Sequence, residues 1–138
     1  MPKKSQTMIF EHFLLFTVGV AIFITAFAVF NSYQSYFSSV TFNDQLNGIK
    51  DYISSNLLKI SLIPENTTMI LQIPKRAGNE FYALNLTNTG LNITAEPSNR
   101  FVFSELFYLN ASFNFSGFIE PGRESIIISK KGNNIFIS

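Results

Sequence analysis

Hydrophobic residues divide the chain into three stretches of different periodicity. In the first, residues 13–30 contain no charge, and Thr17 and Thr25 are the polar side chains. About 20 apolar residues in a helix, at a rise of about 1.5 Å each, cross the hydrocarbon layer of a membrane. A core helix of that length normally keeps one polar stripe, which is missing here. We therefore expect a helix surrounded by lipid or by other apolar helices, with both threonine hydroxyls bonded to carbonyls of the preceding turn.

A second helical signal follows in residues 42–60. Successive apolar positions are separated by 4, 3, 4, 4 and 3 residues, which predicts one face of an α-helix. They are Phe42, Leu46, Ile49, Ile53, Leu57 and Ile60. Pro64 predicts the end of the helix. We expect one helix over residues 6–62, roughly 80 Å long, whose second half packs this apolar stripe on the domain that follows.

The remainder of the chain alternates between short β-prone runs and turn residues. The predicted strands are 68–73, 80–87, 91–95, 101–106, the run 107–119, 125–129 and 134–138, and the last two form a hairpin around Gly132. Six or seven strands spaced about ten residues apart are typical of a small antiparallel sheet or sandwich. The predicted fold class is α+β, a long N-terminal helix followed by a small antiparallel, sandwich-like β head. A β head of about 74 residues without disulfides has marginal stability by itself, so we expect the helical stripe to complete its core.

Composition narrows the possible functions. The chain has no cysteine, one histidine (His12), 14% charged residues and a net charge of +1. Cysteine-ligated zinc, thiol nucleophiles and disulfides are excluded, and a Ser-His-Asp device would have to use His12. No basic patch for nucleic acid and no D-x-D-x-D-G metal spacing occurs in the sequence. We expect no enzymatic activity, no cofactor, no metal site and no nucleic-acid partner.

Charges flanking the apolar stretch predict its orientation. Lys3 and Lys4 precede it, and the next basic residue is Lys50. The positive-inside rule then places the N-terminus in the cytoplasm and the chain after Asn31 outside. This exported part has eight basic and eight acidic residues, so its formal charge is zero. No small-x-small cleavage site follows the apolar run, and we expect the run to stay with the mature protein.

The first thirty residues carry a more specific pattern. A short basic leader, Lys3-Lys4, is followed by Ser5-Gln6, then by Glu11 at the edge of the apolar run. This arrangement resembles the class III signal peptides of archaeal type IV pilin-like proteins, which include archaellins, adhesion pilins and pilin-like accessory subunits. The resemblance implies that a prepilin peptidase removes the leader. Cleavage between Ser5 and Gln6 fits the basic–small–Gln pattern and makes Glu11 sixth in the mature chain, whereas cleavage after Gln6 makes it fifth; we favour the former.

The resemblance also implies how the protein assembles. The new N-terminal ammonium is neutralised by Glu11 of a neighbouring subunit, since two charges are tolerated in an apolar bundle as a pair. The helices form the core of a filament, with large side chains of the apolar run at the contacts: Phe13, Phe16, Phe23, Phe27 and Phe30. Implied partners are copies of the chain or related pilins, a membrane assembly platform, and lipid before assembly. The residues alone leave an alternative, in which Glu11 lies at the membrane–water interface and pairs with His12.

The predicted organisation is therefore a cleavable leader (1–5), a membrane or filament-core helix (6–62) and an extracytoplasmic β head (63–138). Three interpretations stay open. The chain is a major or minor filament subunit, an accessory or stator-type component whose head binds the cell envelope, or an unrelated single-pass anchor with a β binding module. Processing of the leader and recovery in surface filaments distinguish them.

Five N-x-S/T acceptor patterns for glycosylation occur in the region expected to be exported. Their asparagines are Asn66, Asn85, Asn92, Asn110 and Asn114. They are consistent with a cell-surface glycoprotein whose sugars shield the edges of the β sheet.

Overall fold

The computed structural model describes residues 3–106, 109 and 111–138, with side chains from residue 7 onward. Its described residues form one helix, α1 (Lys3–Leu62), and seven strands: β1 (Thr67–Gln72), β2 (Phe81–Thr87), β3 (Gly90–Glu96), β4 (Phe101–Glu105), β5 (Asn114–Ile119), β6 (Ser125–Lys131) and β7 (Asn134–Ile137). The chain divides into two compact units, an N-terminal unit of residues 1–40 and a head unit of residues 41–138. The division falls within α1, so the later part of the helix belongs to the head unit.

Described residues of the N-terminal unit are helical throughout. Hydroxyls of Thr17 and Thr25 donate hydrogen bonds of 2.8 Å to the carbonyl oxygens of Phe13 and Ala21, as the sequence predicted. These bonds satisfy the polar groups inside the helix, so the threonines do not interrupt its apolar character.

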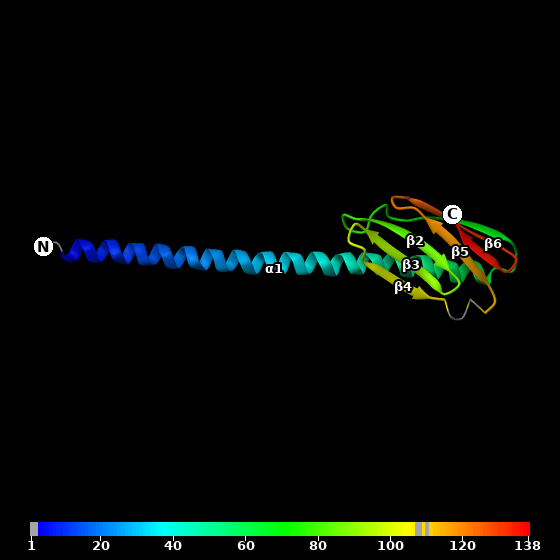
Figure 1. Ribbon diagram of the computed structural model, residues 1–138, viewed down its shortest axis with the longest axis horizontal. Coiled ribbons are helices and arrows are strands. Elements are labelled where there is room, and N and C mark those ends of the chain that lie inside the picture. Colours follow the sequence, from blue (N-terminus) through cyan, green and yellow to red (C-terminus); the bar gives the residue numbers. More distant parts are fainter. Residues whose placement is uncertain (1–2, 107–108, 110) are drawn as a thin grey trace. The chain divides into compact units, whose positions relative to one another are not determined.

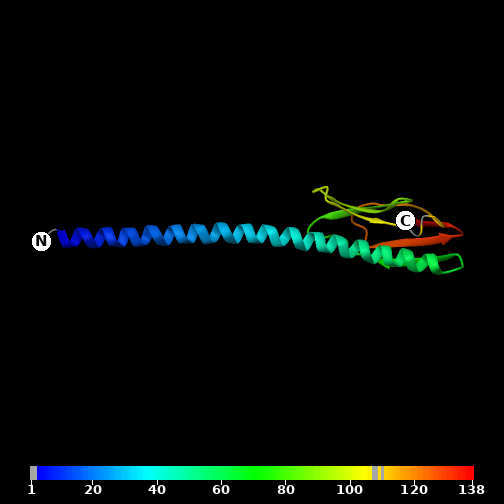
Figure 2. The same ribbon diagram turned by 90° about the horizontal axis from the view of Figure 1, so that it is seen from below.

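The core of the head unit lies between the later part of α1 and the sheet (Figure 2). All six residues of the predicted stripe are buried, and Leu46, Ile53, Leu57 and Ile60 are fully so. Burying one Leu or Ile side chain contributes about 1.5–3 kcal/mol, which makes the stripe a large part of the head's stability. The prediction that this helical face completes the core of the head is confirmed.

One seven-stranded sheet covers the stripe, with the order β1-β6-β7-β5-β2-β3-β4 (Figure 1). All neighbouring strands are antiparallel except β5 and β7, which are parallel. The predicted C-terminal hairpin is confirmed as β6 and β7, in which Lys131 faces Asn134 across the turn. The chain therefore ends in the middle of the sheet, between β6 and β5.

Two details of the predicted head differ from the structure. The strands form one mostly antiparallel sheet and not two facing sheets, because the helical stripe supplies the second layer that a sandwich needs. The run 107–119 becomes a strand only from Asn114, since Leu109 accepts hydrogen bonds from the N–H groups of Ser112 and Phe113 in a turn. Residues 107, 108 and 110 of that run lie outside the described residues.

Along β2 and β3, side chains alternate between the core and the outward face of the sheet. Leu84 and Leu86 of β2 are buried against the core, and Asn85 between them is exposed. Strand β3 follows the same rule, with Ile93 buried and Asn92 pointing to the other face. The outward face of the sheet is thus lined by amides, hydroxyls and several aromatic rings.

Candidate functional site

Large apolar side chains cover the surface of the N-terminal unit. The five phenylalanines predicted to take part in assembly are between 60% and 72% exposed: Phe13, Phe16, Phe23, Phe27 and Phe30. Their spacing of 3, 7, 4 and 3 residues places them within about 100° of one another around a helix of 3.6 residues per turn. We call this the phenylalanine face. So large an apolar surface marks contact with lipid or with protein.

A stripe of small residues lies about 130° around the helix from the phenylalanine face. This small-residue stripe consists of Thr17, Ala21, Thr25, Ala28, Ser32 and Ser35. Besides the two threonines, Ser32 and Ser35 donate hydrogen bonds of 3.0 and 3.1 Å to the carbonyls four residues earlier. All four hydroxyls are therefore satisfied within the helix, and the stripe presents an apolar and narrow surface. Small residues of this kind allow another helix to approach closely.

The glutamate at the start of the apolar run is exposed. Ion pairs among the described residues join Lys50 to Asp51 at 3.4 Å and Lys75 to Glu124 at 3.5 Å, and neither includes Glu11 or His12. The alternative pairing of Glu11 with His12 is therefore not present in this conformation. Ser5 and Gln6, the predicted cleavage site, lie in the first turns of α1, and their side chains are outside the described part.

By length and composition, the described part of α1 has a segment that can cross a membrane. None of its most apolar window is buried within the protein. A membrane anchor and a signal sequence near the N-terminus share these properties. The structure thus establishes a long N-terminal helix whose most apolar segment is not buried within the protein.

Four of the five predicted glycosylation sites lie on the described surface of the head, and Asn110 falls outside the described residues. Asn66 Oδ1 accepts a hydrogen bond of 2.8 Å from the Gly132 N–H, and Asn114 Nδ2 donates one of 3.3 Å to Asn134 Oδ1. Asn85 and Asn92 are direct partners on β2 and β3. The sequence placed these two asparagines in separate motifs, and the register of the hairpin brings them together.

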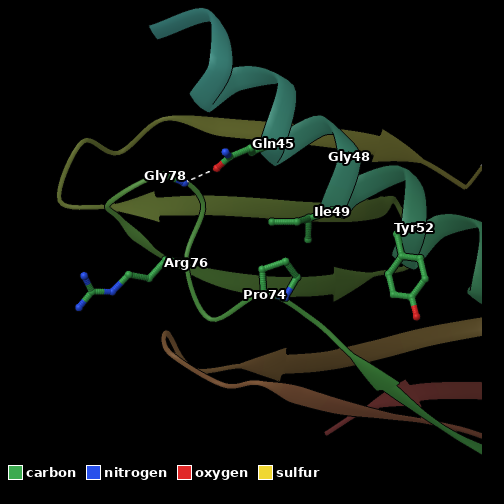
Figure 3. Close-up of a pocket in the computed structure, with 7 residues that line it drawn as sticks. All are labelled: Gln45, Gly48, Ile49, Tyr52, Pro74, Arg76 and Gly78. Carbon is green, nitrogen blue, oxygen red and sulfur yellow. Dashed lines mark hydrogen bonds between the residues drawn. The ribbon is translucent and has the colours of Figure 1, made fainter. Parts of the chain in front are cut away.

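A groove of about 580 Å³ runs beside the later part of α1 (Figure 3). It is lined by Gln45, Gly48, Ile49, Tyr52, Pro74, Arg76 and Gly78. Gln45 Oε1 accepts a hydrogen bond from the Gly78 N–H, which ties the loop between β1 and β2 to the helix. At Gly78, φ is +57° and a Cβ would lie 3.2 Å from the Phe42 ring, so glycine suits this contact. The groove offers apolar surface and one guanidinium, that of Arg76.

Sequence reasoning did not find this groove. Gln45, Gly48 and Tyr52 lie off the apolar stripe of α1, and Arg76 lies in a polar loop. Periodicity identifies the buried face of a helix, but it does not tell which loop folds back beside that face. The described residues contain no cluster of three or more His, Asp or Glu side chains with metal-binding geometry.

Comparison with family models, curated proteins and solved structures gives no match to this chain. What the structure establishes is an α+β protein in which a long apolar N-terminal helix precedes a β-sheet head. This order of elements is that of type IV pilin-like proteins.

Proposed function

We propose that the chain is a structural subunit of an archaeal type IV pilin-like surface filament. The apolar helix packs with copies of itself or with related pilins, and the β head faces solvent. The observation that carries this proposal is the pair of helix faces in the N-terminal unit, the phenylalanine face and the small-residue stripe.

The two faces support assembly over simple anchoring. A single helix in lipid needs apolar side chains on all of its faces, but large and small side chains can be distributed among those faces in any way. Helices that pack on one another need large side chains on one surface and small ones on another, so that backbones come close. The phenylalanine face of one copy fits the small-residue stripe of the next, because the hydroxyls of that stripe are already bonded within the helix.

Glu11 has a specific part in this proposal. Its carboxylate lies beside an apolar segment and has no ion-pair partner within the described residues. A charge carried into a water-free helix bundle costs several kcal/mol unless it is paired. Removal of residues 1–5 by a prepilin peptidase creates an ammonium on Gln6, which pairs with Glu11 of a neighbouring copy.

Localisation follows from the same arrangement. The N-terminus lies in the cytoplasm beside an assembly platform, the apolar run is held in lipid before assembly, and the head is exported. The role is structural, without enzymatic activity.

Replacement of the glutamate tests the proposal. Cells that produce Glu11→Ala are sheared, and the protein is quantified in the filament and membrane fractions. We expect the variant to reach the membrane in normal amount and to be lost from the filaments. Glu65→Ala, which removes an exposed carboxylate of the head, is the matched control and should assemble normally. Normal filament yield from Glu11→Ala would overturn the role of Glu11, and wild-type protein found only in the membrane would favour the accessory component.

A further inference from the structure

The outward face of the sheet contains a second groove, which we call the outer groove. Strands β2, β3 and β4 form it, and its volume is about 440 Å³, within the usual range for ligand sites. The lining consists of Asn85, Thr87, Thr89, Asn92, Thr94, Phe101 and Phe103. All of these belong to the head unit, so the outer groove is present whether or not the N-terminal helix assembles with other copies.

Strand register builds this groove as ordered rows. Asn85 is the partner of Asn92, and Asn92 is also the partner of Phe103 on β4. On its other side, Asn85 faces Phe118 of β5, so the two amides lie between two aromatic rings. In the next row Thr94 is the partner of Phe101. The three rings are 42%, 60% and 68% exposed for Phe103, Phe118 and Phe101, which is unusual for side chains of this size.

Phe103 is held in place by a glycine. A Cβ at Gly90 would lie only 2.6 Å from Cζ of the Phe103 ring and 2.3 Å from the backbone oxygen of Ser104. The ring therefore lies over the bare backbone of Gly90, where any larger residue would displace it. A ring fixed in this way offers a flat apolar surface with little entropy left to lose on binding.

An unsatisfied polar atom lies beside the rings. Asn92 Oδ1 is buried and has no hydrogen-bond partner among the described residues. The amide's Nδ2 donates to Thr94 Oγ1 at 3.4 Å, which leaves the oxygen as the free acceptor of the side chain. Leaving a buried acceptor unpaired is costly, and a ligand donor removes this cost once the Asn92 side chain turns its oxygen toward the groove.

The lining also determines the charge of the ligand. It has amides and hydroxyls, which both donate and accept hydrogen bonds, and it has no charged side chain. Glu105 shares the outward face of β4 and lies in the same row as Gly90 and Thr87, but it is not among the residues that line the groove. A fitting ligand is uncharged, carries many hydroxyls and has a flat apolar face for the rings. We propose that the outer groove binds a neutral saccharide chain non-covalently.

The saccharide belongs to another molecule and is not a glycan attached to Asn85 or Asn92. Side chains stand roughly perpendicular to a sheet, so a sugar joined to either Nδ2 leads away from the surface. The outer groove instead crosses three strands, and Asn92, whose Oδ1 has no partner among the described residues, is one of the residues that line it. A saccharide that lies across the strands contacts the rings together with the amide and hydroxyl groups of the lining.

Saturation-transfer NMR on the full chain tests the proposal. The protein is produced in a host without N-glycosylation and kept in a detergent without sugar headgroups, which would compete. Hexasaccharides of glucose (α- and β-linked), mannose and N-acetylglucosamine are the probes, with hexagalacturonate as the charged control. We expect transfer to at least one neutral probe and none to the acidic one. Transfer to no neutral probe at millimolar concentration, or only to the acidic one, would overturn the proposal.

Variants locate the contact. Phe103→Ser and Asn92→Ala should each weaken binding by about tenfold or more. Ile70→Ser, which removes an exposed apolar side chain from β1, is the matched control and should bind as the wild type does. If Phe103→Ser does not fold, Phe101→Ser replaces it, since its ring is more exposed. An equal loss of saccharide binding in Ile70→Ser would contradict the assignment. A glycan attached to Asn85 of the native protein that fills the outer groove would contradict it as well.

Discussion

Lys130 Nζ donates a hydrogen bond of 2.9 Å to the carbonyl oxygen of Ser61 and so joins strand β6 to the end of α1. A second bond goes to the carbonyl of Ile63, and the ammonium lies 4.9 Å from the centroid of the Phe113 ring. Only 6% of the lysine is exposed. A cation at this end of a helix is favoured by the helix dipole, and it satisfies carbonyls that have no partner in the helix.

Lys130→Met should destabilise the head because it leaves two carbonyls at the helix end without a donor. We expect a loss of about 2 kcal/mol in the free energy of unfolding, measured by denaturant titration of the full chain in detergent. Lys131→Met on the same strand removes an exposed lysine and should cost less than about 0.5 kcal/mol. Equal losses in the two variants would show that the buried ammonium has no special role.

Two adjacent leucines of α1 test the packing of the helix on the sheet. Leu57 is fully buried in the core, whereas Leu58 is about half exposed. Leu57→Ala should lower the free energy of unfolding by about 3 kcal/mol, because it removes buried methyl groups and leaves a cavity. Leu58→Ala should lower it by less than about 1 kcal/mol. If both variants unfold at the same denaturant concentration, the stripe does not form the core.

Tyr82 makes the stability of the head depend on alkaline pH. Burial raises the pKa of its phenol from 10.0 to about 12, and the hydroxyl donates a hydrogen bond to the Pro74 carbonyl. The folded protein holds the proton more tightly than the unfolded chain, so this stability is fully present below pH 10 and is lost as the pH rises to 12. We expect a decrease of about 2 kcal/mol over that window. Tyr82→Phe should remove this part of the pH dependence, and an unchanged profile would contradict the raised pKa.

The small-residue stripe gives a test of assembly that leaves the head intact. Ala21→Leu enlarges a residue of the stripe and should reduce the yield of sheared filaments severalfold, because the neighbouring helix can no longer approach. Ala26→Leu makes the same change beside the phenylalanine face, where large side chains already form the surface, and should leave the yield near normal. Membrane insertion of both variants, measured by fractionation, should equal that of the wild type, since leucine is favourable in lipid. Equal yields from the two variants would argue against a directional helix contact.

Much of the fold was predictable because it depends on local periodicity. The spacing from Phe42 to Ile60 identified the buried face of the helix, and alternation identified the strands to within a few residues. Strand order was not predictable, because β7 inserts beside β5 through contacts between distant parts of the chain. The spacing of the strands left a single sheet and a sandwich open, because it does not tell into how many layers the strands assemble.

The buried lysine and the row of outward-facing side chains could be recognised only from the structure. A lysine such as Lys130 is expected in solvent, and only the position of β6 beside the helix end explains its burial. Asn85, Asn92 and Phe103 form one row because of hairpin register, which no single motif encodes. By contrast, Glu11 and the apolar run were evident from composition and charge alone.

The decisive test of processing and assembly is mass spectrometry of the N-terminal peptide, from protein recovered in sheared surface filaments. We predict a chain that begins at Gln6, or at Thr7 in the alternative register, and that is abundant in the filament fraction. An intact Met1, or a chain that remains in the membrane as a single copy, would contradict the proposed filament subunit.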